Sequence, residues 1–113
     1  MQRDYDIYID DILGSIKKIE AYTKGKSQQE FMKNSLLVDG VIRNLEIIGE
    51  AVKKIPAGIK KNHPKIEWNK IAGLRDILIH EYFGINLEIV WDVIINKLPA
   101  LRDSTNRIKK SIK

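Results

Sequence analysis

One short stretch of the chain combines residue types that could do acid–base chemistry on a phosphodiester. The segment 73–84 is otherwise apolar but carries Arg75, Asp76, His80, Glu81 and Tyr82. Imidazole exchanges protons near neutral pH, with an unperturbed pKa of about 6.5. Guanidinium stays charged and can hold two phosphate oxygens. RNA cleavage without a metal needs a base for the 2′-hydroxyl, an acid for the leaving oxygen and cationic donors, so His80 is the candidate titrating group and Arg75 the candidate phosphate ligand.

The same residues also have a purely structural explanation. Arg75 could pair with nearby carboxylates, His80 could form a hydrogen bond at a helix end, and Tyr82 could pack half-buried. Residue types alone leave both explanations open.

The spacing of Arg75 and His80 sets a geometric condition on any shared site. Five residues at about 100° each leave the two side chains roughly 140° apart around an ideal helix. Local unwinding near Gly84, a bulge, or a second copy of the chain across a twofold axis could bring them together. A symmetric dimer would also supply two histidines, one as base and one as acid.

Apolar residues recur at three- and four-residue steps in four segments, which predicts amphipathic helices. The first segment begins at Tyr5 and stops near Gly25. The second begins at Ser27, which forms a capping-box pattern with Glu30, and runs as one long helix until Pro56. We expect an irregular connector or a single short turn over 57–63.

The last two periodic segments lie in the C-terminal half of the chain. One begins near Trp68 and stops at Gly84, and the other begins at the N-cap residue Asn86 and continues to Ile108. Pro99 should bend or divide the last helix. No alternating run predicts a strand. The sequence therefore predicts an all-α, up-down bundle of four to five helices.

Length and composition restrict the class of protein further. At 113 residues the chain should form a single domain, 1–113. It has no cysteine and two histidines, so a thiolate or histidine-rich metal site is not expected, and no cofactor is predicted. No apolar run reaches membrane-spanning length, and the start of the chain does not resemble a signal peptide. We expect a cytoplasmic protein without membrane contact.

The chain has a moderate excess of positive charge, with a formal net charge of +5. Part of this excess lies in three clusters: Lys53–Lys54, Lys60–Lys61 and the tail 107–113. These clusters could contact RNA or could be solvated helix ends, and the sequence does not decide between the two.

The segment 73–84 resembles a known signature. Four residues separate Arg75 from His80, and Tyr82 follows His80 by two positions. This spacing resembles the Arg-x4-6-His motif of HEPN ribonucleases in its HepT-type form, His-x-Tyr. The resemblance covers essentially the whole chain. It includes the segments 44–51, 68–73 and 90–91, which are similar to the family's second helix, its approach to the motif and its last helix.

The resemblance to HepT-like toxins of the HEPN superfamily implies a fold, a site and partners. It implies a HEPN-type homodimer with a cleft at the interface and an endoribonuclease activity in which Arg75 and His80 are catalytic. Asp76 matches a position that is often polar and could orient Arg75 or His80. Tyr82 corresponds to the tyrosine that a cognate MntA-type nucleotidyltransferase antitoxin modifies with AMP.

Two questions stay open at this point. Arg43, Glu46 and Glu50 share one side of the second helix, where they could support the site or form a surface ladder of ion pairs. HEPN folds also serve as non-catalytic subunits that dock and regulate a nucleotidyltransferase, which is the alternative function. The presence of arginine, histidine and tyrosine together favours the enzyme.

Overall fold

The computed structural model describes residues 5–80 and 84–111, with Ile79 and His80 described for the backbone alone. The elements in chain order are α1 (Asp6–Thr23), α2 (Gln28–Lys33), α3 (Ser35–Lys54), α4 (Ala57–Lys61), α5 (Trp68–His80), α6 (Leu87–Asp92), the π-helical turn η2 (Val93–Lys97) and α7 (Leu98–Ser111). The described residues contain no strand, so the predicted all-α class is confirmed.

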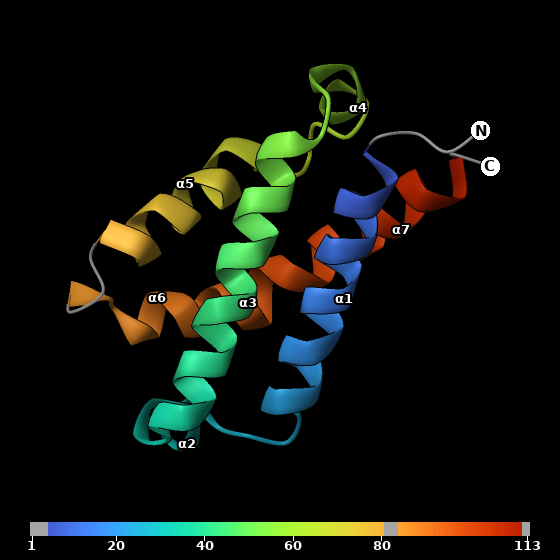
Figure 1. Cartoon of the computed structure of the whole chain (residues 1–113). Coiled ribbons are helices and arrows are strands. Elements are labelled where there is room, and N and C mark those ends of the chain that lie inside the picture. The colour runs from blue at the N-terminus through green and yellow to red at the C-terminus, as the bar shows by residue number, and fades with distance from the viewer. Residues whose placement is uncertain (1–4, 81–83, 112–113) are drawn as a thin grey trace.

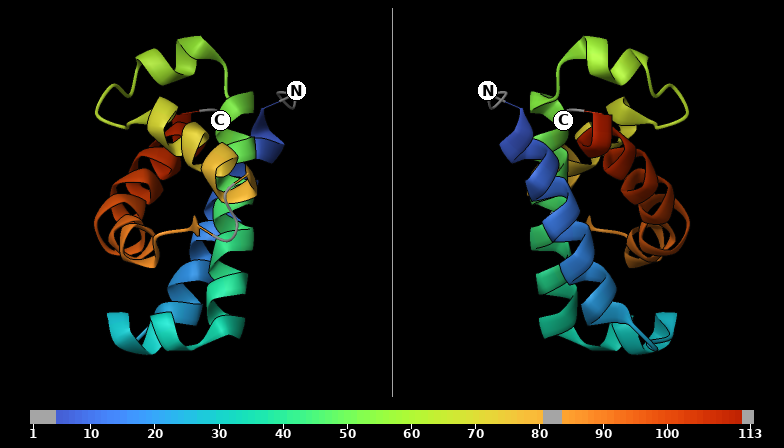
Figure 2. Two further views of the ribbon diagram at one scale, coloured as in Figure 1. Left: turned by 90° about the vertical axis from the view of Figure 1, so that its left-hand side faces the viewer. Right: turned by 90° about the vertical axis from the view of Figure 1, so that its right-hand side faces the viewer.

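Four long helical runs, formed by α1, α3, α5 and the continuous run α6–η2–α7, make up the bundle. Helices α1 and α3 lie side by side and antiparallel, and α5 packs against the other side of α3 (Figure 1). The run α6–η2–α7 passes behind α3 and α1 in that view, and α7 packs against α1. Figure 2 shows that this run forms a second layer beside the α1–α3 pair.

One hydrophobic core fills the space between these runs, and its side chains come from the predicted three-four stripes. Burial of such aliphatic side chains contributes roughly 1.5–3 kcal/mol each. Fully buried members include Ile9, Ile12, Ile16 and Ile19 of α1, Val41, Ile48 and Val52 of α3, Leu78 of α5, and Leu101 and Ile108 of α7.

The local signals for helix ends are largely confirmed. Gly25 has a φ of 73°, a left-handed conformation that favours glycine, and it ends the first predicted helix. The Ser27 hydroxyl accepts from the backbone N–H of Glu30 at 3.1 Å, and the Ser27 N–H donates to the Glu30 carboxylate at 2.9 Å. The Asn86 side chain accepts from the N–H groups of Glu88 and Ile89 at the start of α6.

The prediction of one long second helix from Ser27 to Pro56 is wrong. The chain leaves the helical conformation at Asn34, with φ of −105° and ψ of 96°, and this divides it into α2 and α3. The Asn34 side chain accepts from the N–H of Leu37 at 3.0 Å. A short amide side chain that caps the next helix competes with continuation of the preceding one, so the helix restarts there.

The connector and the proline bend match their predictions. Within the expected connector 57–63, α4 is a five-residue helical turn. Before Pro99 the chain widens into η2, which includes Ile95. A proline ring clashes with the carbonyl four residues earlier, here that of Ile95, and a wider turn relieves this clash.

Two further expectations concern the end of α5 and the membrane. The last helical residue of α5 is His80, and the expected stop at Gly84 follows residues 81–83, which lie outside the described residues. Within the part of the chain that the structure describes, no helix is long and apolar enough to cross a membrane.

Candidate active site

The position of Arg75 depends on an unusually close approach of two helices. A β-carbon added at Gly49 of α3 would lie 2.4 Å from the Arg75 β-carbon and 3.2 Å from the Ile71 carbonyl oxygen. Glycine in a helix interior costs roughly 0.8–1.0 kcal/mol relative to alanine, so its presence here requires a packing reason. The missing side chain at Gly49 lets α5 lie directly on α3, with Arg75 at the point of contact.

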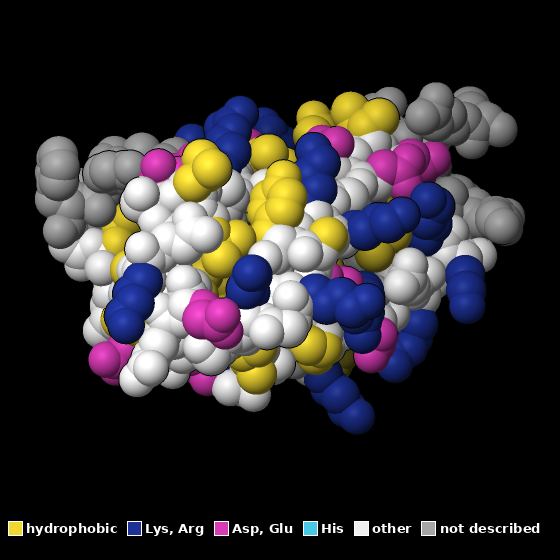
Figure 3. All heavy atoms as spheres, turned by 90° about the horizontal axis from the view of Figure 1, so that it is seen from below, with side chains coloured by type: hydrophobic (Ala, Val, Ile, Leu, Met, Phe, Trp, Pro, Cys, Tyr) yellow, Lys and Arg dark blue, Asp and Glu magenta, His cyan; other side chains and the backbone are white. Residues whose placement is uncertain are grey.

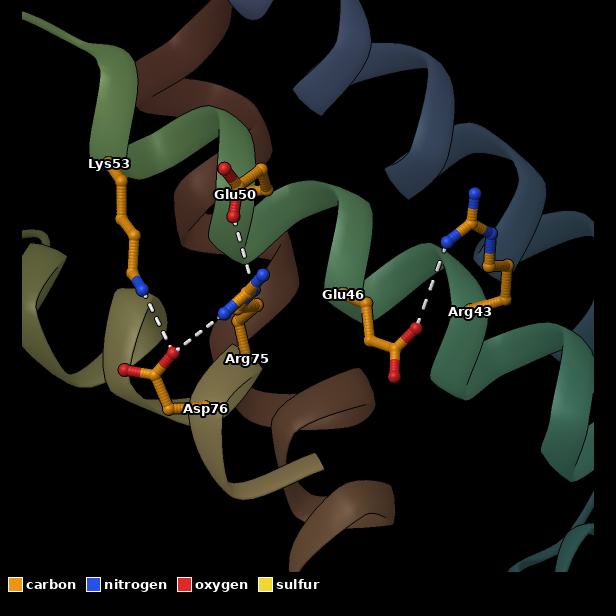
Figure 4. A network of polar contacts seen from close by, with 6 residues as sticks. All are labelled: Arg43, Glu46, Glu50, Lys53, Arg75 and Asp76. Carbon is orange, nitrogen blue, oxygen red and sulfur yellow. Dashed lines mark hydrogen bonds and ion pairs between the residues drawn. The ribbon is translucent and has the colours of Figure 1, made fainter. Parts of the chain in front are cut away.

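Two carboxylates from different helices hold the Arg75 guanidinium. Arg75 Nε lies 3.1 Å from Glu50 Oε2, and Arg75 Nη1 lies 3.0 Å from Asp76 Oδ1 (Figure 4). The Arg75 side chain is 30% exposed, so it is held in place while part of it still faces solvent. Among the described residues, no carboxylate pairs with Nη2, which leaves that nitrogen free to hold a phosphate oxygen.

Lys53 extends this cluster and controls the ionisation of Asp76. Lys53 Nζ lies 2.9 Å from Asp76 Oδ1, the same oxygen that Arg75 contacts. The hydrogen bond from Lys53, followed by that from Arg75, holds the pKa of the Asp76 carboxyl below its usual value. Asp76 therefore stays ionised well below neutral pH and keeps its contacts with both cations.

Arg75 lies at the edge of a pocket of about 250 Å³ between α1, α3 and α5. The pocket is lined by Tyr8, Asp11, Arg43, Glu46, Ile47, Glu50, Ala51 and Arg75. The predicted polar side of the second helix thus faces this pocket. Arg43 and Glu46 contact each other weakly, with Arg43 Nη1 3.9 Å from Glu46 Oε1, so both keep polar atoms for other partners.

The structure brings several of the expected polar residues together, while the side chain of His80 lies outside the described part of the chain. Arg75, Asp76 and Glu50 form one connected cluster, and Arg43 lies across the same pocket. The backbone of α5 is continuous from Arg75 to His80, so it contains no bulge or unwound turn between these two residues. Tyr82 lies outside the described residues.

Four residues of this site were not assigned to it from the sequence, although Lys53 was named there as part of a basic cluster. Lys53 lies three positions after Glu50, so helical spacing placed it on the same side. Gly49 was recognisable as a glycine inside a helix. Tyr8 and Asp11 share a three-residue spacing on α1, but nothing in the sequence indicated that α1 borders the motif helix.

The two tryptophans take structural positions. Trp68 is 7% exposed in the core. Trp91 is partly buried and its ring centroid lies 5.3 Å from that of Phe31. Among the described side chains, no group of three or more His, Cys, Asp or Glu residues is placed to hold a metal ion.

Comparison with known proteins identifies the class of this chain. Residues 12–108 match the family described as Ribonuclease HepT-like. The chain belongs to this family, and its all-α bundle is of the HEPN type that the sequence motif indicated.

Several relatives align with almost the whole of this chain, over half to all of their own length. The "Probable ribonuclease HepT" of Thermococcus cleftensis is 37% identical over 97% of this chain and all of its own. The "Putative RNase TTE0752" of Caldanaerobacter subterraneus is 42% identical, over 89% of this chain and 90% of its own. The "Gamma-glutamylcyclotransferase and putative RNase MJ0434" of Methanocaldococcus jannaschii is 40% identical over 99% of this chain, which spans half of that longer protein. No solved structure matches the chain significantly.

Proposed function

We propose that this chain is a metal-independent endoribonuclease and the toxin of a toxin–antitoxin pair. The observation that carries the proposal is the Arg75 guanidinium, held by Glu50 and Asp76 beside an open pocket, in a chain of the HepT-like family. Its relatives are named as ribonucleases, which supports RNA as the substrate.

The proposed reaction is cleavage by the 2′-hydroxyl of the RNA itself. A histidine takes the proton of the 2′-hydroxyl, whose oxygen attacks the adjacent phosphorus. The bond from phosphorus to the 5′-oxygen breaks, and that oxygen receives a proton from a second histidine. The products are a 2′,3′-cyclic phosphate and a 5′-hydroxyl. Arg75 stabilises the charge that develops on the phosphoryl oxygens.

A homodimer supplies the second histidine in this scheme. Two apolar side chains, Ile77 of α5 and Ile89 of α6, are 52% and 55% exposed at a groove of about 560 Å³ between these helices. Ile77 precedes His80 by one helical turn, so a twofold contact through this groove would bring the ends of the two α5 helices together. We infer that a second copy of the chain covers the groove and completes the site.

Neutralisation by a nucleotidyltransferase antitoxin completes the proposal. The Tyr82 hydroxyl attacks the α-phosphorus of ATP, pyrophosphate leaves, and AMP stays joined to the tyrosine. Because Tyr82 follows His80 by two residues, the added phosphodiester brings negative charge and bulk beside the catalytic groups. We expect this modification to prevent RNA binding.

The test of the ribonuclease is cleavage of a labelled RNA with and without a chelator. We expect cleavage to persist in the chelator and to leave cyclic phosphate ends. We expect Arg75→Ala and His80→Ala each to abolish it while circular dichroism shows the parent's helicity. Complete inhibition by the chelator, or a folded His80→Ala protein with full activity, would contradict the proposal.

The test of the antitoxin is co-expression with a candidate cognate nucleotidyltransferase. Mass spectrometry should find AMP on the peptide that contains Tyr82. The variant Tyr82→Phe keeps the aromatic ring but lacks the acceptor oxygen, so it should stay unmodified and toxic. Full neutralisation of Tyr82→Phe without modification elsewhere would show that the antitoxin acts by binding alone.

A further inference from the structure

The basic clusters of the sequence differ in how many carboxylates lie close to them in the structure. The cluster at the end of α7 lies beside the acidic start of α1, where Lys109 Nζ is 2.9 Å from Asp10 Oδ1. Nearer the start of α7, Arg102 pairs with Glu20 of α1. Lys109 and Arg102 are thus matched by carboxylates of the helix on which α7 packs, so these two residues have a structural explanation, whereas Arg107 and Lys110 make no ion pair with any carboxylate that the structure describes.

The segment from the end of α3 to the start of α5 is different because it contains many lysines and few acidic residues. Residues 53–70 hold six of the 20 lysines and arginines but one of the 15 aspartates and glutamates. The rest of the chain has 14 of each sign, so this segment of 18 residues carries the whole net charge of +5. We call its lysines the lysine end: Lys53, Lys54, Lys60, Lys61, Lys65 and Lys70.

Most lysines of this end face solvent without a neutralising partner. Lys53 and Lys70 pair with Asp76 and Glu67. The other four lysines make no ion pair with any carboxylate in the part of the chain that the structure describes: Lys54, Lys60, Lys61 and Lys65. Three of these are exposed, and Lys60 is half-buried. They are therefore available to an anionic partner.

The lysine end is an ordered structure. The Trp68 indole N–H donates to the His63 carbonyl at 3.1 Å, and the indole ring is buried in the core. Backbone N–H groups of His63 and Ile66 donate to the carbonyls of Lys60 and His63. These bonds fix the connector between α4 and α5, and Lys60, Lys61 and Lys70 line one hollow of about 420 Å³ there.

The lysine end adjoins the candidate active site through shared contacts. Lys53 contacts the same Asp76 oxygen that Arg75 contacts. Helix α5 begins seven residues before Arg75, which corresponds to about 10 Å along the helix axis. A single RNA strand of a few nucleotides that leaves Arg75 toward α4 would therefore pass over these lysines.

The opposite face of the molecule shows a different distribution of charge. Figure 3 views the structure from below, the side away from α4 in Figure 1. Lys and Arg side chains there lie among Asp, Glu and apolar side chains. The residues outside 53–70 carry 14 side chains of each sign, so they give little net attraction for a polyanion, in contrast to the lysine end.

We propose that the lysine end binds the phosphates of the RNA strand that flanks the scissile bond, so that the strand enters or leaves the site past α4. This inference rests on the proposed function for its substrate. It assigns to α4 and the connector, which take no part in the chemistry, the role of holding a substrate longer than the two nucleotides that are cut.

The test compares two charge-matched quadruple variants. The first changes Lys54, Lys60, Lys61 and Lys65 to Gln, and the control changes four exposed lysines of α1 and its following loop, Lys17, Lys18, Lys24 and Lys26, to Gln. Binding of a labelled single-stranded RNA is measured against salt in the Arg75→Ala background, which prevents cleavage. Cleavage of a dinucleotide is measured with Arg75 present.

We expect the first variant to bind RNA at least about tenfold more weakly at low salt. The slope of log affinity against log salt should become shallower by about 2–3, because each lost phosphate contact removes roughly 0.7 from it. Dinucleotide cleavage should stay at the parent's rate because that substrate does not reach the lysine end. The control should keep the parent's slope.

Three results would overturn the inference: an unchanged slope in the first variant, an equal loss in the control, or an equal loss of affinity for poly-L-glutamate, which would indicate an acidic protein partner. Failure of the proposed function is recognised separately. A protein that binds RNA with the expected slope but does not cleave it would support RNA binding by the lysine end and contradict the ribonuclease assignment.

Discussion

Arg75 contacts one carboxylate on its own helix and one on α3, and this double contact fixes the plane of its guanidinium. A lysine at this position would carry the same charge on a single nitrogen and could not satisfy Glu50 and Asp76 at the separate atoms that they now contact. Lys53 adds a third cation–carboxylate contact through Asp76. The site is thus a chain of alternating charges from Lys53 to Glu50.

The pH dependence of this chain of charges follows from Asp76. The pKa of Asp76 is lower in the folded protein than in the unfolded chain, where an aspartate carboxyl has a pKa of about 3.9. The stabilisation is therefore fully present above about pH 4 and is lost as the pH falls through the folded pKa. We expect Asp76→Asn to lower the free energy of unfolding at pH 7 and to differ less from the parent as the pH is lowered below about 4.

Urea unfolding at several pH values measures this difference, and a double-mutant cycle with Lys53→Gln serves as the control. Since Lys53 is the main cause of the lowered pKa, the effect of Asp76→Asn should be smaller in the Lys53→Gln background. An effect of the same size in both backgrounds would show that Lys53 and Asp76 are not coupled.

At the scale of the elements, the contact between α3 and α5 decides where the site lies. The close approach at Gly49 sets the distance between the two helices, and that distance allows Glu50 to reach Arg75. A side chain at Gly49 would push α5 away from α3. The effect would spread to the core because Leu78 and Ile71 pack from the same helix.

We expect Gly49→Ala to destabilise the protein by about 1–3 kcal/mol, since the added β-carbon overpacks the helix contact. Gly14→Ala on α1 is the matched control, because no atom lies within 4 Å of a β-carbon there. It should stabilise the protein by up to about 1 kcal/mol through helix propensity. Urea unfolding separates the two, and equal effects would mean that α3 and α5 adjust to the extra carbon without cost.

Features that depend on residues close together in the sequence were predicted better than contacts between residues far apart in it. Capping at Ser27 and Asn86, the stop at Gly25 and the apolar stripes are local, and they were predicted correctly. The break at Asn34 was missed because asparagine is compatible with a helix interior and its cap forms only when the chain turns. The contact of Lys53 with Asp76 joins residues 23 positions apart, and such a contact follows from the packing of α3 on α5.

At the scale of the whole molecule, the exposed groove between α5 and α6 is the proposed contact between two copies. We expect Ile77→Glu with Ile89→Glu to convert a dimer to a monomer and to reduce RNA cleavage at least about tenfold, because charged side chains would be buried at the contact. Light scattering after size-exclusion chromatography gives the mass. Leu36→Glu, at an 83% exposed position of α3, is the control that should change neither property.

A parent protein that is already monomeric would contradict the dimer, and so would an Ile77→Glu, Ile89→Glu variant that keeps the dimeric mass. A monomeric variant with full activity would be compatible with a dimeric parent protein, but it would show that the dimer does not supply the second histidine. These outcomes separate the assembly from the chemistry.

The ion pair between Lys109 and Asp10 has a consequence for how the fold can be carried in longer polypeptides. It joins the last turns of α7 to the first turns of α1, so the chain enters and leaves the bundle at neighbouring points on one side (Figure 1). A domain with adjacent entry and exit points can be appended to another domain, or inserted into a surface loop, without reordering its helices. The relative from Methanocaldococcus jannaschii, in which a matching segment occupies half of a longer protein, is an arrangement that this geometry permits. It also makes the chain suited to circular permutation, with the old ends joined by a short linker and new ends opened at the exposed turn around Gly25.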